Sequence, residues 1–180
     1  MNTKKTLLLA VILVVVISSL GMVSAGWFGS DDVETSSFKF ECPDGYNQVD
    51  YATTFSNTAL PIGDPLYLNG TNDSKIMVAE ISKEMYDNLS AKEYKNTSSD
   101  DLPAEWSGTA LAMGDKVKMD ETEGPMRIVS QSSSLGTETL GITEIDGKYY
   151  SVEIAHTLEY IDPKEDADLI KNIFSSLEAK

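Results

Sequence analysis

The sequence predicts an α+β fold: a single domain with an antiparallel sheet covered by a C-terminal amphipathic helix and short middle helices, preceded by an N-terminal apolar helix. Three observations predict this class. Apolar and polar residues alternate as in strands near both ends of the domain, a helical apolar stripe closes the chain, and an unbroken apolar run opens it. The chain has no internal repeat, and the roughly 150 residues after the apolar run can bury one ordinary core.

The first 25 residues are typical of a signal peptide. Lys4 and Lys5 precede an apolar run over residues 7–17, and the small residues Val23-Ser24-Ala25 follow it as a cleavage site. Cleavage at this site would make Gly26 the first residue of the mature protein. The sequence therefore predicts export from the cytoplasm.

The same segment can also act as an uncleaved membrane anchor. No charged residue occurs over residues 6–30, and about 20 helical residues are enough to cross a ~30 Å hydrocarbon core. Ser18, Ser19 and Gly21 weaken the second half of the apolar run, which favours cleavage. In the anchored form, contact with the membrane would be limited to residues 6–25.

The exported part is strongly acidic. Removing residues 1–25 takes away two of the 14 basic residues and none of the 29 acidic ones, so the formal net charge changes from −15 to −17. Such a charge argues against nucleic acid, whose phosphates require clustered Lys and Arg, and against anionic lipid surfaces. It favours solubility, cation condensation, or a protein or cell-envelope partner that is cationic. A solvated acidic surface suited to an exported protein explains the same charge without a partner.

Cysteine usage adds one constraint. The chain has a single cysteine, Cys42, so no internal disulfide can staple the domain. We expect a small buried side chain, with a disulfide to another chain as the alternative. The oligomeric state stays open.

The domain is expected to begin at Phe38. Residues 26–37, GWFGSDDVETSS, predict an acidic flexible tether, because they are small, polar and without a regular period. The domain over residues 38–180 then opens with a half-buried strand, FKFEC, in which apolar and charged residues alternate. The PDG sequence that follows predicts a turn.

Residues 65–81 contain two apolar runs that predict a hairpin, with a polar loop from Asn69 to Ser74. Ser82 is a candidate N-cap of a short helix. That helix would point three apolar side chains inward: Met85, Tyr86 and Leu89. Ser90 with Glu93 forms a second capping-box pattern and predicts another short helix.

Residues 148–160 predict one long strand with a buried face and an exposed face, because apolar or aromatic residues recur at every second position. The buried parity holds Tyr150, Val152, Ile154, His156, Leu158 and Tyr160. The opposite parity holds Ser151, Glu153, Thr157 and Glu159.

The turn before this strand has two candidate forms. A two-residue Asp146-Gly147 turn would place Ile142 opposite Ser151, which separates the apolar sets of the two strands. A three-residue turn with Gly147 left-handed pairs Ile142 with Tyr150 instead. We expect the three-residue form.

The C-terminal segment, DPKEDADLIKNIFSSLEAK, predicts the amphipathic helix. Asp162 is the N-cap, Pro163 occupies the first helical position, and Glu165 completes a capping box. Asp166 and Asp168 lie toward the positive end of the helix dipole. One apolar stripe should pack on the sheet: Ile170, Ile173, Phe174 and Leu177.

Two pieces of this domain carry a family resemblance. The first is the opening strand Phe38-Lys39-Phe40 with the turn Pro43-Asp44-Gly45-Tyr46, and the second is the strand KYYSVEIAHTLEY that runs into a helix ending LIKNIFSSL. Together they resemble the PsbP-like superfamily, whose fold is an α/β/α sandwich. The resemblance implies a role as an extrinsic subunit, a partner-binding module or an exported protein, and it implies no catalytic residues.

His156 is the only histidine and belongs to the expected buried face. It could serve as a base or ligand in a pocket, or as a hydrogen-bonded core residue. No second histidine, neighbouring cysteine or G-x-S-x-G motif supports catalysis, and one His with one Cys makes no spaced set of transition-metal ligands. We expect the core residue, and no cofactor.

The acidic segment GDKVKMDETEG offers hard oxygen ligands of the kind that Ca²⁺ prefers. The candidate ligands are Asp115, Asp120, Glu121 and Glu123. Their spacing does not match the twelve-residue helix-loop-helix site, so we expect a solvated charged loop and keep a calcium site as the weaker reading.

Four of the eight asparagines stand in N-x-S/T motifs, which are acceptor sites for N-linked glycans in exported proteins. They are Asn69, Asn72, Asn88 and Asn96. A polar loop explains the same residues without modification, so both interpretations stay open.

These features predict an exported, non-enzymatic binding or structural module of the cell envelope or the extracellular space. The alternative is a small-ligand-binding or hydrolytic enzyme with a pocket near His156. A catalytic reading requires that acidic residues, tyrosines and His156 converge in one deep cleft.

Overall fold

The computed structural model describes residues 32–50, 61–70, 74–94, 116–133, 136–157 and 162–180. The chain divides into two compact units, Met1–Asp31 and Asp32–Lys180, and all described residues belong to the second. The expected signal over residues 1–25 and residues 26–31 of the expected tether therefore lie outside the described residues.

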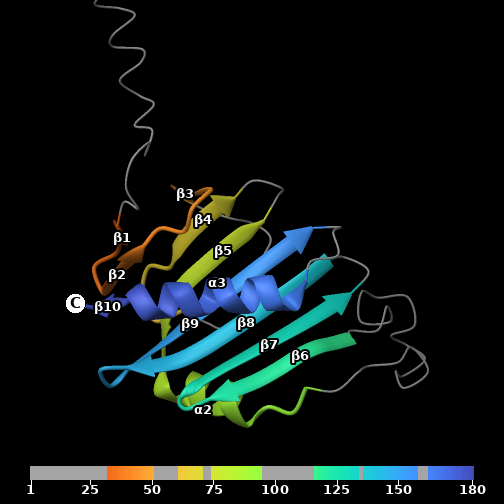
Figure 1. The fold of residues 1–180 in the computed structure, drawn as a ribbon. Coiled ribbons are helices and arrows are strands. Elements are labelled where there is room, and N and C mark those ends of the chain that lie inside the picture. The colour runs from red at the N-terminus through yellow and green to blue at the C-terminus, as the bar shows by residue number, and fades with distance from the viewer. Residues whose placement is uncertain (1–31, 51–60, 71–73, 95–115, 134–135, 158–161) are drawn as a thin grey trace, which may run out of the picture. The chain divides into compact units, whose positions relative to one another are not determined.

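Two antiparallel sheets form the second unit (Figure 1). The larger sheet has seven strands in the order β3-β4-β5-β9-β8-β7-β6, and the smaller has three in the order β1-β2-β10. The strands are β1 Asp32–Glu34, β2 Phe38–Glu41, β3 Tyr46–Val49, β4 Leu66–Gly70, β5 Lys75–Ile81, β6 Lys116–Glu123, β7 Met126–Ser133, β8 Gly136–Ile145, β9 Lys148–Thr157 and β10 Glu178–Ala179.

Helices cover both faces of the larger sheet. Helix α3, Pro163–Ser176, lies across one face, and helix α2, Lys83–Ala91, packs on the other (Figure 1). The face under α3 carries the main core, which includes Val78, Val152, Ile154, Ile170, Ile173 and Phe174. The smaller cluster under α2 consists of Ile81, Leu89, Leu140 and Ile142. A mostly antiparallel structure with these two helices confirms the α+β class, while the second sheet was not expected.

The structured unit begins at Asp32, six residues before the expected start at Phe38. Residues 32–34 form β1 because Val33 lies only 8% exposed and packs in the core with Phe38 and Phe40 of β2. The sequence reasoning missed this strand because a single apolar residue between two acids shows no alternating pattern.

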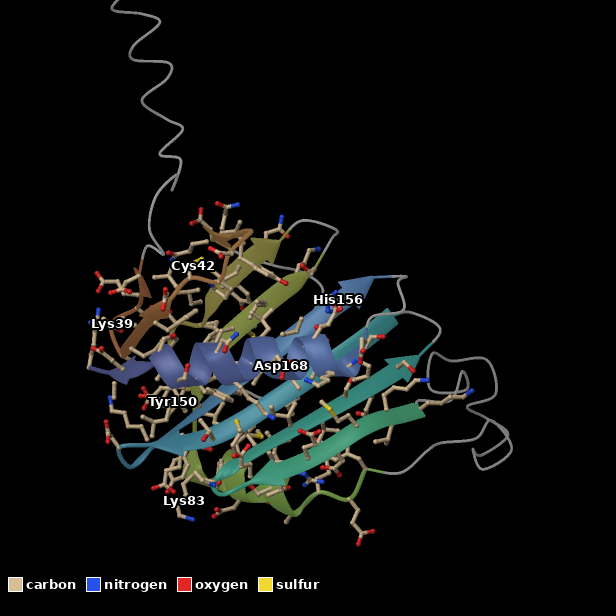
Figure 2. All side chains as sticks on the ribbon, in the orientation of Figure 1. Lys39, Cys42, Lys83, Tyr150, His156 and Asp168 are labelled. Atoms are coloured by element: carbon tan, nitrogen blue, oxygen red, sulfur yellow. The ribbon has the colours of Figure 1, made fainter. Side chains whose placement is uncertain are left out.

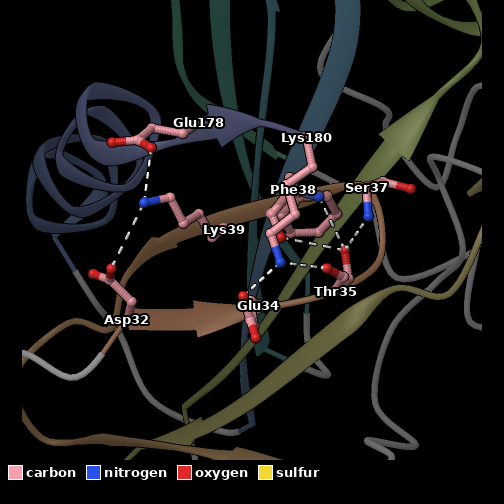
Figure 3. Close-up of polar contacts among 8 residues, drawn as sticks. All are labelled: Asp32, Glu34, Thr35, Ser37, Phe38, Lys39, Glu178 and Lys180. Carbon is pink, nitrogen blue, oxygen red and sulfur yellow. Dashed lines mark hydrogen bonds and ion pairs between the residues drawn. The ribbon is translucent and has the colours of Figure 1, made fainter.

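Hydrogen bonds and ion pairs join the C-terminal residues to the other strands of the smaller sheet (Figure 3). The Lys180 backbone N–H donates to the Ser37 carbonyl at 2.9 Å, and Lys180 Nζ donates to Glu34 Oε2 and to the Thr35 carbonyl. Lys39 Nζ lies 2.8 Å from a Glu178 carboxylate oxygen. The last residues of the chain are therefore held beside β2 and the turn that joins β1 to β2. Lys180 holds the pKa of Glu34 below its usual value, through a hydrogen bond and its charge.

The expected register of the β8–β9 hairpin is wrong. Ile145 pairs with Lys148 and Ile142 with Ser151, so the turn has two residues, Asp146 at φ 52° and Gly147 at φ 78°. Positive φ at both positions is the type I′ geometry that matches strand twist and suits an Asp-Gly pair. Gly147 is left-handed as expected, but the three-residue turn does not form.

The two-residue turn places Leu140 and Ile142 of β8 on the face of the sheet opposite to the apolar residues of β9. This arrangement is possible because both faces of the sheet are buried at this point. Strand β9 is buried on both faces, since Ser151 and Glu153 are 0% exposed like Tyr150 and Val152. Leu140 and Ile142 of β8 point to the α2 face, where they meet Leu89, and not to the α3 face. The prediction of one exposed face on this strand was therefore wrong.

Both expected helix caps are present. Ser82 accepts a hydrogen bond from the Met85 N–H at 3.1 Å, and Asp162 accepts one from the Lys164 N–H at 3.0 Å. A helix capped by Ser90 is not found, because Ser90 lies inside α2. No helix among the described residues is long and apolar enough to cross a membrane.

Candidate functional site

Strand β9 carries buried ionisable side chains on both of its faces. His156 and Tyr150 lie near opposite ends of the strand on the α3 side (Figure 2). Glu153 is buried on the opposite side, below the sheet face that α2 partly covers. We describe one cluster on each side: the His156 cluster and the Arg127 cluster.

The His156 cluster consists of His156, Asp166, Thr139 and Ser130. His156 Nε2 lies 2.8 Å from Asp166 Oδ1, and the two residues are 8% and 3% exposed. The pair joins the end of β9 to the first turns of α3. His156 is thus a hydrogen-bonded residue at the edge of the core, as expected from the sequence.

Two hydroxyls complete this cluster. Thr139 Oγ1 donates to Asp166 Oδ2 at 2.6 Å and lies 3.0 Å from Ser130 Oγ. Thr139 has one hydroxyl proton, so with Asp166 as its acceptor the Ser130 hydroxyl must donate the second bond. Both oxygens of the Asp166 carboxylate are engaged, which satisfies a buried acid that would otherwise be costly.

Tyr46 of β3 and Ser74 are two further polar residues on the same face of the sheet as the His156 cluster. Ser74 Oγ donates to the Tyr46 hydroxyl at 3.0 Å, and the Tyr46 ring lies over Gly70, where an added Cβ would come within 2.6 Å of the ring. Burial raises the pKa of Tyr46. The hydrogen bond from Ser74 acts against this shift, and the charge of Asp166 adds a smaller upward contribution.

The chemistry open to the His156 cluster is limited by burial. A carboxylate that orients an imidazole is the second half of a Ser-His-Asp arrangement. The two hydroxyls in the cluster, on Ser130 and Thr139, are 0% exposed and bond to Asp166 or to each other. In this arrangement neither is open to a substrate, and the network joins α3 to the sheet.

The Arg127 cluster lies on the opposite face of the sheet. Arg127 Nε and Nη2 donate to the two Asp120 carboxylate oxygens at 2.9 and 2.8 Å, and Nη1 donates to the carbonyls of Leu89 and Ser90 at 3.0 and 2.7 Å. Helix α2 has no basic residue in its own last turn, so Arg127 of β7 caps its C-terminal carbonyls.

A shallow hollow of about 580 Å³ adjoins Arg127. Its other lining residues are Ser90, Ala91, Lys92, Glu93, Tyr94, Asp120 and Thr122. Two cations lie close to the Tyr94 ring, with Lys92 Nζ 4.7 Å and Arg127 Cζ 5.1 Å from its centroid. Burial raises the pKa of Tyr94, and nearby Arg127 opposes that shift. The hollow combines both signs of charge, so it has no clear preference for an anion.

The calcium candidates do not come together among the described residues. Asp120 is bound to Arg127, while Glu121 lies on the other face of β6 and contacts Lys171 of α3 at 3.4 Å. Asp115 lies outside the described residues. Within the described ranges, no group of three or more His, Cys, Asp or Glu side chains is arranged to hold a metal ion.

Two of the four glycosylation candidates can be placed. Asn69 is exposed near the end of β4, and Asn88 is exposed on α2. Asn72 and Asn96 lie outside the described residues. Cys42 is partly buried, and its thiol donates to the Tyr46 carbonyl at 3.5 Å.

Sequence reasoning missed Asp166, Arg127 and Glu153. For Asp166 a signal exists: it lies four and seven positions before Ile170 and Ile173, on the same helical stripe, which predicts burial. Arg127 shows no such signal, because the carbonyls it caps belong to a helix distant in sequence. Glu153 shows none either, because alternation along its strand places it on the polar face.

Comparison with known proteins finds a similarity in fold to solved structures. No protein-family model matches this sequence, and no curated protein matches it. Among solved structures, the chain is similar to the solution structure of cyanobacterial PsbP (CyanoP) from Synechocystis sp. PCC 6803, with 12% sequence identity and a TM-score of 0.44. The match covers 87% of this chain and 96% of that one.

Proposed function

We propose that this chain is an exported, non-enzymatic binding or structural module of the cell envelope or the extracellular space, and that its acidic surface engages a cationic partner. The proposal joins three features. They are the export signal at the start of the sequence, the closed His156 cluster, and the distribution of charge over the domain.

The distribution of basic side chains carries the proposal. Six of them in the described part of the chain lie within 4.0 Å of a carboxylate: Lys39, Lys83, Arg127, Lys164, Lys171 and Lys180. These cations are spread over separate elements and each is compensated locally, so they do not build a basic patch. The surplus of 29 acidic over 14 basic residues in the whole chain then dominates the field that a partner meets.

The His156 cluster supports a non-enzymatic role. Catalysis by a histidine requires a nucleophile or substrate within hydrogen-bond reach of its ring. His156 is 8% exposed, its Nε2 is committed to Asp166, and the hydroxyls joined to that carboxylate are fully buried.

A binding experiment tests the proposal. The mature protein, isolated from its native host, is used to capture partners from the envelope fraction of that host. Capture should weaken as salt rises from about 0.01 M to about 1 M, over which the screening length falls from ~30 Å to ~3 Å. Capture that is insensitive to salt would contradict an electrostatic mode.

Matched variants separate charge from shape. One variant neutralises three exposed acids by Glu→Gln at Glu84, Glu123 and Glu144. Its control replaces three exposed neutral residues by Ala: Ser36, Asn47 and Gln48. Neutralisation should lower both the affinity and its salt dependence, whereas the control should leave both unchanged.

The second candidate is a hydrolase, and the contact between His156 and Asp166 is the observation that favours it. A broad hydrolase screen on the mature protein, with His156→Ala alongside, decides between the two. Turnover that disappears in the variant while its thermal melt stays unchanged would defeat the non-enzymatic proposal.

A further inference from the structure

We propose that Asn69 and Asn88 carry N-linked glycans, and that the sugars at these positions cover the α2 side of the domain. This inference rests on the proposed export, because N-glycans are a feature of exported chains. It goes beyond that proposal by assigning two modification sites and by naming the side of the domain that the sugars cover.

Asn69 lies near the end of β4 with its side chain in solvent. The strand register places it beside Asn47 of β3 and Lys75 of β5, and Lys75 in turn beside Ala155. The register places these residues on the same face of the sheet as Leu140 and Ile142 of the smaller core cluster, which is the face that α2 covers. Asn47 is exposed as well, so a sugar on Asn69 would extend into solvent and not into a packed surface.

Asn88 lies on the exposed surface of α2. Its motif is Asn88-Leu89-Ser90, in which both the asparagine and the serine are exposed, while Leu89 between them is 5% exposed and anchors the helix. The amide that would receive the sugar and the hydroxyl that defines the motif are therefore both accessible. Modification here leaves the contact of α2 with the sheet intact.

The α3 side provides an internal comparison. Asn172 is exposed on α3, but its motif position is taken by Phe174, which is 7% exposed in the core. In the part of the chain that the structure describes, both motif asparagines belong to the α2 side, and α3 lies across the opposite face (Figure 1). Sugars on these two residues would therefore leave α3 uncovered.

Mass spectrometry of the protein isolated from its native host tests the inference. Fragment spectra that identify the modified residue, and so separate Asn69 from the motif asparagine Asn72 three positions later, should find a glycan on Asn69 and on Asn88. Asn47 and Asn172, which are also exposed but lack the motif, should carry none. Ser90→Ala keeps Asn88 and removes only the motif hydroxyl, so it should abolish the added mass at Asn88 and leave that at Asn69.

The outcomes are distinguishable from failure of export. Unmodified Asn69 and Asn88 in a protein whose N-terminus is Gly26 would overturn the glycan sites while leaving export intact. Unmodified asparagines in a cytoplasmic protein that retains Met1 would overturn both proposals. A glycan that persists at Asn88 in the Ser90→Ala variant would show that attachment does not follow the motif.

Discussion

Tyr150 is a fully buried residue whose hydroxyl has no hydrogen-bond partner among the described residues. Its ring packs edge-on against Phe38, with centroids 5.8 Å apart, so the aromatic body contributes to the core. Burial raises the pKa of Tyr150 from 10.0 to about 12. The ring of Tyr150 therefore stabilises the core, whereas its hydroxyl is buried without the compensation of a hydrogen bond from the described residues.

Tyr150→Phe should leave the free energy of unfolding at pH 7 unchanged or raise it by roughly 1 kcal/mol, since it removes a buried hydroxyl without a partner. Chemical denaturation measures this change. A loss of more than about 1 kcal/mol would instead reveal a hydrogen bond to that hydroxyl.

The same substitution should change the alkaline limb of the stability curve. Unfolded tyrosine ionises near pH 10, whereas Tyr150 in the folded domain keeps its proton to about pH 12. The unfolded state therefore loses its proton first, and stability present below pH 10 falls as pH rises toward 12, by about 2–3 kcal/mol. Tyr150→Phe should lack this component, so the difference between the two proteins should grow across that interval.

Asp166→Ala should destabilise the domain by about 3 kcal/mol, because it leaves the His156 ring and the Thr139 hydroxyl buried without their shared acceptor. Asp168→Ala on the same helix is the control: Asp168 makes an exposed ion pair with Lys164, so little change is expected. Denaturation midpoints of the two variants provide the comparison. Equal effects would mean that the buried pair contributes no more than a surface one.

At the scale of elements, the position of α3 depends on a close approach to β8. Gly141 lies beneath the helix, where an added Cβ would collide with Ile170 Cγ2 and come within 3.1 Å of Phe174. The side chains of Ile170 and Phe174 can approach the strand this closely because Gly141 has no side chain of its own. The same contact brings the first turns of α3 within reach of β9, where Asp166 meets His156.

Gly141→Ala should cost about 1–3 kcal/mol, because the helix must shift to admit the methyl group. Gly63→Ala is the matched control, since a Cβ at Gly63 meets nothing within 4 Å. Thermal melts of both variants test the prediction. An unchanged melt for Gly141→Ala would show that α3 moves freely on the sheet.

Gly147→Val should destabilise the β8–β9 hairpin by about 1–3 kcal/mol, because a β-branched residue resists the positive φ of 78° found there. Gly147→Asn should cost less, since asparagine tolerates the left-handed region. Space is not the cause in either case, because a Cβ at Gly147 has no neighbour within 4 Å. Similar losses for Val and Asn would point to a different origin.

At the scale of the whole molecule, maturation is the property that the sequence predicts most directly. N-terminal sequencing of the protein from its native host should find Gly26 first, in the soluble extracellular or loosely bound fraction. Recovery of Met1 or Asn2 from the membrane fraction would instead make residues 6–25 an anchor. The stalk between that anchor and β1 would then be short, because the structured unit begins at Asp32.

The candidate site could be predicted only in part. The single histidine and its buried parity were visible in the sequence, and the structure places His156 as expected. Its partners could not be identified, because Ser130, Thr139 and Asp166 come from three elements that only the sheet order brings together. The Arg127 cluster was invisible for the same reason, since the carbonyls it caps lie 37 and 38 residues earlier in the chain.

Local signals in the sequence were sufficient for the class of fold, for both helix caps, for the β4–β5 hairpin and for the stripe on α3, because each depends on residues within a few positions of one another. The register of the β8–β9 hairpin and the burial of Glu153 were decided by tertiary structure. A strand's alternation indicates one buried face only when the other face meets water, and the helices on opposite faces leave β9 at the centre of the sheet with no such face.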